Sequence, residues 1–168
     1  RRTTMQFPSL KKAITGATVA LAVLASSPTF AQSGPAYDDT GKAKAFPGIP
    51  SGTVEAMGGE EGIRSWVEAL FHYILLDYRI APTFREFGNI ERQIALNTQL
   101  VQRVLGGNVE YMGASMSAAH SDLGITMTEF NAVVEAAYNA CDRNLIKYHD
   151  CNQLINALAP FTDDIVTR

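Results

Sequence analysis

Residues 57–80 read MGGEEGIRSWVEALFHYILLDYRI, and this stretch carries the clearest periodic signal in the chain. Its apolar residues recur at intervals of three and four, at Ile63, Trp66, Val67, Leu70, Phe71, Ile74 and Leu75. This spacing predicts an amphipathic helix. The paired glycines followed by two glutamates indicate the start of the helix, and Asp77–Arg79 with Pro82 indicate its end.

A second helical stripe follows through Ile90, Ile94, Asn97, Val101 and Val104. It stops at Gly106-Gly107, where glycine can adopt the left-handed conformation that closes a helix. Between Asn108 and Gly124 the pattern is weaker, and small residues predict a short helix or an ordered loop.

The third long helix has a marked start, because Thr126 and Glu129 have the spacing of a capping box. Its stripe runs from Phe130 to Cys141, and a fourth stripe carries Leu154, Ile155, Leu158, Phe161 and Ile165. No useful length of the chain alternates with the period of two that a half-buried strand requires. The sequence therefore predicts an all-α domain.

Length and charge limit the classes of function. A chain of 168 residues is long enough for one domain with its own core and too short for two domains of typical size. Charged residues make up 18% of the chain and the net charge is −3, which offers no basic surface for nucleic acid or for an anionic membrane. We therefore expect no nucleic-acid partner.

The first 31 residues have the composition of a secretory signal. Four basic residues precede an uncharged apolar run from Ala13 to Ser26, and small residues lead to a cleavage position after Ala31. The apolar run is shorter than the roughly 20 residues of a membrane-spanning helix, which favours a cleaved signal over a permanent anchor. We therefore expect an exported, periplasmic protein that has no membrane span after cleavage.

Removal of residues 1–31 leaves ten basic and seventeen acidic residues, so the exported part is acidic. Residues 32–53 hold three prolines and four glycines and predict a flexible leader. The folded domain is then expected at residues 54–168.

Export also affects which chemical state we expect for the two cysteines. Cys141 and Cys151 are ten residues apart across a predicted turn between helices. In an oxidising compartment this spacing favours a disulfide over a zinc site, since the chain has no CxxC motif and no supporting pair of histidines. The alternative is a pair of unbonded cysteines, one of them in the core.

Among three histidines, His120 is the candidate ligand. It lies in the segment of small residues just before the third long helix begins, where its side chain could project between the long helices. His72 and His149 are predicted to lie on the surface. The helical stripes lack the paired carboxylates of a di-iron bundle, and no phosphate loop or nucleophile elbow occurs.

Several of these features together resemble the truncated haemoglobins of group one. The resemblance covers about residues 54–168 and rests on Met57-Gly58-Gly59, Asp77-Tyr78-Arg79-Ile80, Phe84, Gly106-Gly107, Tyr111, Gly113, Ala119-His120, Leu123-Gly124-Ile125-Thr126 and Phe130. It implies a two-over-two helical sandwich that binds haem b, with His120 as the proximal iron ligand. It also implies that Phe84 packs on the haem and that the distal side is lined by Gln93, Leu96, Asn97 and Leu100.

One residue departs from the family pattern. Members usually have a tyrosine on the first long helix whose hydroxyl reaches the bound ligand, and Phe71 stands at that position. Phenylalanine has no hydrogen-bond donor, so Gln93 and Asn97 are left as the candidate donors to bound O2. The resemblance therefore implies weaker ligand retention than in relatives with the tyrosine.

The resemblance also suggests how the haem would be held. Arg92, Arg103 and Tyr111 are the candidate partners of the propionates. Some relatives attach the haem covalently through a histidine on the last helix, but Phe161 lies near that place here, so the haem is expected to be extractable.

The sequence thus predicts an exported haem protein that binds O2, NO or CO reversibly. If the protein is an enzyme, the expected reaction is oxidation of NO by O2 with an electron-donor protein. The alternatives are a haem-based sensor or redox subunit that docks to an envelope partner, and a helical interaction module without haem.

Overall fold

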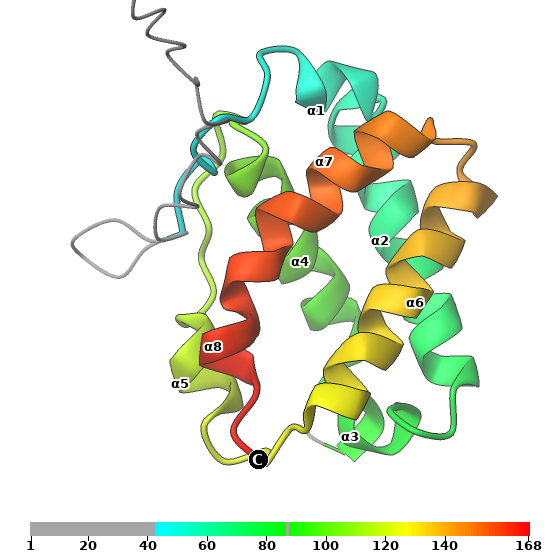
Figure 1. Ribbon diagram of the computed structural model, residues 1–168, viewed down its shortest axis with the longest axis vertical. Helices are drawn as coiled ribbons and strands as arrows, with labels where there is room; N and C mark the ends of the chain where they lie inside the picture. The colour runs from blue at the N-terminus through cyan, green and yellow to red at the C-terminus, as the bar shows by residue number, and fades with distance from the viewer. Residues whose placement is uncertain (1–42, 87) are drawn as a thin grey trace, which may run out of the picture. The chain divides into compact units, whose positions relative to one another are not determined.

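The helices of this protein form two layers around one core, as a computed structural model shows (Figure 1). The structure describes residues 43–86 and 88–168. Their helices are α1 (Thr53–Ala56), α2 (Gly59–Leu76), α3 (Ala81–Glu86), α4 (Ile90–Val104), α5 (Met116–His120), α6 (Met127–Arg143), α7 (Tyr148–Leu158), the 3-10 turn η1 (Ala159–Phe161) and α8 (Thr162–Ile165).

Two pairs of long helices make up the layers. Helix α2 packs beside α4 and α6 beside α7, while α6 also lies on α2 and α7 on α4 (Figure 1). All the regular elements in residues 43–86 and 88–168 are helical. The predicted all-α, two-over-two architecture is therefore confirmed.

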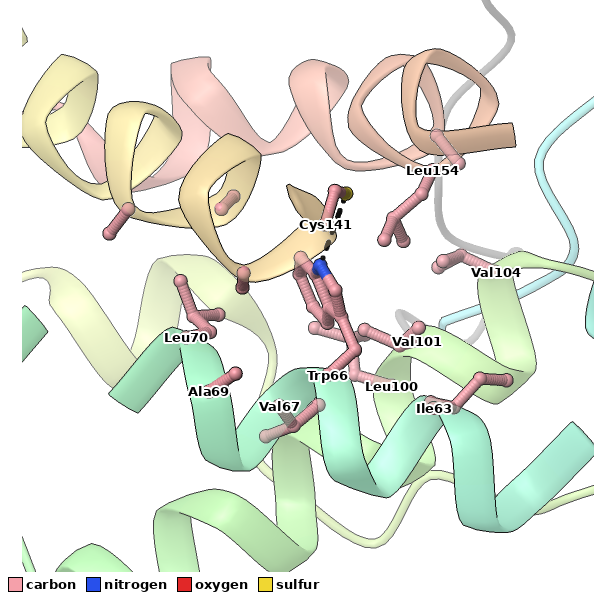
Figure 2. Packing of buried hydrophobic residues seen from close by; sticks show 14 of the residues in the cluster. Ile63, Trp66, Val67, Ala69, Leu70, Leu100, Val101, Val104, Cys141 and Leu154 are labelled. Carbon is pink, nitrogen blue, oxygen red and sulfur yellow. Dashed lines mark hydrogen bonds between the residues drawn. The ribbon is translucent and has the colours of Figure 1, made fainter. Parts of the chain in front are cut away.

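Helix α2 follows the predicted stripe. Its N-cap is Gly58, whose φ of 87° lies in the left-handed region that favours glycine. Trp66, Val67 and Ile74 on its inner face are almost completely buried. Figure 2 shows how this face packs against residues of α4, α6 and α7. The helix ends at Leu76, just before the predicted boundary at Asp77.

Helix α4 also begins and ends where its sequence indicates. The Asn89 side chain caps it by accepting a hydrogen bond from the N–H of Arg92 at 2.9 Å. At the other end Gly106 has a φ of 87°, and the N–H of Gly107 donates to the carbonyl of Gln102 at 2.8 Å. This is the glycine closure that the sequence predicts.

The predicted fourth helix is interrupted. Helix α7 ends at Leu158, and the chain continues through η1 before α8 begins at Thr162. Pro160 lies inside η1 and has no N–H to donate to a preceding carbonyl, which explains why a regular helix does not continue through it.

Residues 43–53 are part of the body, which corrects the predicted boundary at residue 54. Ala43 and Phe46 are buried in the core, and the N–H of Phe46 donates to the carbonyl of Val104 at 2.8 Å. Proline and glycine content alone could not reveal these contacts because they involve a helix far along the chain. The expected signal at 1–31 and the rest of the expected leader, 32–42, lie outside the described residues.

The structure joins Cys141 to Cys151 in a disulfide. Cys141 lies in the last turn of α6 and Cys151 in the first turn of α7, with their Cα atoms 6.0 Å apart. Both cysteines are buried. The bond therefore fastens the two helices of one layer at the turn between them.

Within the described part of the chain, no helix has both the length and the apolar character needed to cross a membrane. Residues 13–26, where the sequence places the apolar run, are not covered by this observation.

The start of α6 has the predicted capping box. The Thr126 hydroxyl accepts from the N–H of Glu129, and the Glu129 carboxylate accepts from the Thr126 N–H at 2.9 Å and from its hydroxyl at 2.7 Å. These hydrogen bonds, with a smaller effect of Arg168, hold the pKa of the Glu129 carboxyl below its usual 4.5.

We expect Thr126→Ala to lower the free energy of unfolding by about 1 kcal/mol at neutral pH, because the first turn of α6 loses its cap. Since the folded-state pKa of Glu129 is lowered, the carboxylate stabilises the fold above its unfolded pKa and this contribution is lost as the pH falls. The difference between wild type and variant should therefore shrink in acid. Urea unfolding at neutral pH and at about pH 3 measures it. The exposed Thr128 supplies the control, and equal losses from Thr128→Ala and Thr126→Ala would contradict the expectation.

Candidate functional site

A cavity of about 560 Å³ lies between the two layers of long helices. This volume is within the usual range of ligand pockets. Side chains from α2 to α8 line it, and most of them are aliphatic or aromatic. A small set of polar groups, from Thr83, Gln93, Asn97, Tyr111, His120, Ser121, Asp122 and Glu129, interrupts the apolar wall. Such a space suits a large, mostly apolar ligand that is oriented by few polar contacts.

His120 is the histidine at this cavity. It is the last residue of α5 and is half-buried. Its Nδ1 lies 2.7 Å from the carbonyl oxygen of Met116, one turn earlier in the same helix. Because a carbonyl can only accept, this contact requires a proton on Nδ1, so in the neutral ring Nε2 keeps a free lone pair. The ring is thus held in the tautomer that a metal ligand needs.

The short helix α5 owes its position to the C-terminal segment. It has only five residues, and α8 packs against it. After α8, the N–H groups of Thr167 and Arg168 donate to the carbonyl of Ile125 at 2.9 and 3.2 Å. These hydrogen bonds tie the loop that follows His120 to the end of the described chain. Tertiary contacts therefore fix the loop after His120, while the imidazole itself is held within α5 by the Met116 carbonyl.

Two phenylalanines form an aromatic part of the wall. Phe71 of α2 is buried, and its ring meets that of Phe84 of α3 at a centroid distance of 5.7 Å and an interplanar angle of 89°. This edge-to-face geometry is a favourable one for aromatic rings. Both residues line the cavity. Neither side chain can donate a hydrogen bond there.

The two predicted amide donors also line the cavity, but both amide groups already have backbone partners. The Gln93 amide donates to the carbonyl of Phe84 at 3.2 Å, and the Asn97 amide donates to the carbonyl of Gln93 at 2.9 Å. Gly88 leaves space for the Gln93 side chain, since a Cβ there would collide with its amide. Each amide has a second N–H. One N–H therefore orients each side chain, and only the other can serve a ligand.

Leu96, Leu100 and Tyr111 also line the cavity. The Tyr111 hydroxyl donates to the carbonyl of Ala114 at 3.0 Å, and burial raises the pKa of this phenol. Tyr111 is therefore neutral at physiological pH, and its proton is already engaged. The ring folds closely over Gly113, where a Cβ would collide with it.

The structure does not bring Arg103 to the cavity, although the resemblance made it a candidate for binding a propionate. Its guanidinium donates to the carbonyl of Ala43 at 3.2 Å, in the segment that the sequence assigned to the leader. Arg92 does not line the cavity either. His72 and His149 are exposed, as predicted. The place of Arg103 in its predicted helix could not show that its side chain would form a hydrogen bond to a distant segment of the chain.

The opposite layer supplies wall residues that the sequence did not assign to the site. Helices α6 and α7 and the segment after them contribute the apolar residues Phe130, Val133, Val134, Ala137, Ile155, Leu158, Phe161 and Ile165. All eight belong to the predicted helical stripes. Their periodicity showed that they face inward but could not distinguish a cavity wall from a solid core.

The described residues offer no metal site made only of protein ligands. Residues 43–86 and 88–168 hold no group of three or more His, Cys, Asp or Glu that could bind an ion.

Comparison with known proteins identifies a family. The model of the family described as bacterial-like globin matches residues 53–167. A group 1 truncated hemoglobin of Tetrahymena pyriformis is 27% identical over 86 residues, which are 51% of this chain and 70% of the relative.

Solved structures show the same fold. The truncated hemoglobin of Tetrahymena pyriformis in its Fe(III) form has a TM-score of 0.65 at 21% identity, over 69% of this chain and 98% of that one. The group II truncated hemoglobin of Bacillus anthracis has a TM-score of 0.63 at 24% identity, over 70% and 92%. The chain therefore belongs to the bacterial-like globin family and has the fold of the truncated, two-over-two globins.

Proposed function

We propose that this protein is a truncated haemoglobin of group one that binds haem b through His120 and reversibly binds O2, and also NO and CO. The observation that carries the proposal is the His120 imidazole, with Nδ1 fixed by the carbonyl of Met116 and Nε2 free, at the wall of an apolar cavity. Both group one and group two proteins share the fold, so the assignment to group one rests on the resemblance of the sequence and on the curated relative from Tetrahymena pyriformis.

The residues present fit a haem in chemical type. A porphyrin needs flat apolar walls, which Phe71, Phe84 and the aliphatic side chains of α4 and α6 offer. An imidazole is the usual protein ligand of a globin iron. Haem, when bound, would supply an iron centre that takes up a diatomic gas reversibly.

The residues of the chain would then control that site. His120 would hold the iron, and the Met116 carbonyl would keep the imidazole basic and correctly oriented. The apolar walls would exclude water. The free N–H groups of Gln93 and Asn97 would be the amide donors to a gas that carries partial negative charge. Tyr111, already hydrogen-bonded, would contribute shape only.

Two alternative activities would use the same site. Oxidation of NO by O2 would need an electron-donor protein, and a sensor or redox role would need an envelope partner. The lack of a donor at Phe71 disfavours the oxidation, because nothing at that position would hold the gas. We also propose that residues 1–31 are an export signal and that the mature protein is periplasmic, on the basis of their composition.

The absorption spectrum of the purified ferrous protein, recorded with and without CO, tests the haem proposal directly. We expect a Soret band that shifts when CO is added. A protein purified from haem-supplemented cells that shows no Soret band would instead be a helical module without haem. Consumption of NO in the presence of O2 and an electron donor would distinguish an enzyme from a reversible binder.

We expect Phe71→Tyr to slow the dissociation of O2 from the haem-loaded protein by about fivefold, because one hydrogen bond in a dry cavity contributes about 1 kcal/mol. Phe71 is buried and lines the cavity, so a hydroxyl there has no water to compete for it. Stopped-flow measurement of O2 dissociation gives the rate. Tyr73→Phe is the matched control, since Tyr73 is on the same helix but not at the cavity. An unchanged or faster rate in Phe71→Tyr would refute the expectation.

A further inference from the structure

Trp66 connects the cavity to the disulfide. It is the only tryptophan of the chain and is completely buried in α2. Its ring lines the cavity, and its indole N–H donates to the Sγ of Cys141 at 3.2 Å, as the dashed line in Figure 2 shows. A buried indole N–H needs an acceptor. Here the acceptor is a sulfur atom of the opposite layer.

That acceptor cannot move freely, because Cys141 is bonded to Cys151. The bond links the end of α6 to the start of α7, and both cysteines are buried. A sulfur is a weak acceptor, so a hydrogen bond to it holds an indole well only if the sulfur itself is fixed. The covalent link supplies this fixation. The orientation of the Trp66 ring is therefore coupled to the disulfide.

Along α2, the cavity wall begins at Trp66. The residues of α2 that line the cavity are Trp66, Leu70, Phe71 and Ile74, and Trp66 is the first of them in the chain. Ile63, one turn earlier on the same helix, is just as buried but is not part of the wall. The large indole thus fills the space between α2 and the disulfide, where a smaller side chain would leave the cavity open.

We propose that Trp66, held by the Cys141–Cys151 disulfide, is a specificity-determining residue that closes this end of the cavity and limits the space open to small apolar gases. The inference rests on the proposed function in one respect, since its effect on gas binding requires the haem. The space itself depends only on the protein. Interiors lined by apolar side chains stay dry and accept xenon when a large residue is removed.

Xenon uptake by Trp66→Leu is the first test. Xenon-129 NMR on the purified full chain should show binding in Trp66→Leu that is at least about threefold tighter than in wild type, because the removed ring leaves an apolar space. Ile63→Ala is the matched control, since it removes a buried side chain of the same helix outside the wall. Equal xenon binding in wild type and Trp66→Leu, or an equal gain in Ile63→Ala, would overturn the proposal.

Kinetics of CO binding to the haem-loaded variants provide the second test. CO association should be at least about threefold faster in Trp66→Leu than in wild type, and xenon should return the rate toward the wild-type value by filling the opened space. Ile63→Ala should keep the wild-type rate with and without xenon. A merely structural role for Trp66 would give no rescue by xenon, and that result would refute the proposal.

Two disulfide variants test the part played by the cysteines. Cys141→Ala/Cys151→Ala removes both the link and the acceptor, whereas Cys141→Ser/Cys151→Ser removes the link and keeps a hydroxyl acceptor at position 141. CO association and the fluorescence of Trp66 should change most in the alanine pair and less in the serine pair. Wild-type values in both pairs would show that the disulfide does not hold the indole.

The outcomes separate this proposal from the haem proposal. Absence of a Soret band in wild type would refute haem binding, and the xenon experiment would still decide whether Trp66 closes the cavity. A normal Soret band with no xenon effect in Trp66→Leu would refute the role of Trp66 alone.

Discussion

His120→Ala is expected to abolish stable haem binding, with loss of the Soret band after gel filtration. Mutation of groups that only support a metal ligand weakens metal binding by about 10- to 100-fold, so removal of the ligand itself should weaken it by more than about 100-fold. His120 is the histidine at the cavity wall, with its Nδ1 already engaged by Met116. Haem titration of the purified apoprotein, followed by absorbance, measures the change.

The other two histidines supply matched controls. His72 and His149 are exposed and do not line the cavity, so His72→Ala and His149→Ala should bind haem as wild type does. Added imidazole should restore part of the spectrum in His120→Ala, because a free ring can enter the space that the side chain leaves. A Soret band in His120→Ala that equals the wild-type band without imidazole would disprove the assignment of the ligand.

Cys141→Ser/Cys151→Ser is expected to lower the free energy of unfolding by about 3 kcal/mol, the chain-entropy value for so short a loop. The cysteines are ten residues apart, and both are buried in the core. For a body of this size the loss corresponds to a fall in Tm of about 10 °C. Serine is chosen because a hydroxyl at position 141 can still accept from Trp66, so the measurement reports mainly on the covalent link.

Urea unfolding with and without a reductant provides the control. Reductant should bring wild type to the stability of the variant and should leave the variant unchanged. If the pair of serines were as stable as wild type under oxidising conditions, the two cysteines would not be bonded in solution.

The sequence was most informative where local chemistry decides the outcome. The stripe in residues 57–80 gave α2, the glycines at 106 and 107 gave the end of α4, and Thr126 with Glu129 gave the cap of α6. Each of these features depends on residues within one or two turns of one another. The spacing of the cysteines likewise favoured the bond that the structure contains.

The sequence was least informative where distant segments meet. It placed residues 43–53 in a flexible leader, but Phe46 is fixed by the carbonyl of Val104 and Ala43 accepts from Arg103. It offered Gln93 and Asn97 as free donors, but each has one N–H bound to a backbone carbonyl. These partners could be identified only after the helices had been placed relative to one another.

The sequence alone thus determined the helices, the candidate histidine and the acidic, apolar-cored character of the body, because periodicity and caps are local properties. Only the tertiary structure decided that two layers enclose a cavity, that α8 and the C-terminal residues fix the loop after His120, and that Trp66 reaches the disulfide. The physical reason is that a stripe specifies which side chains are buried but not how well they fill the space between layers.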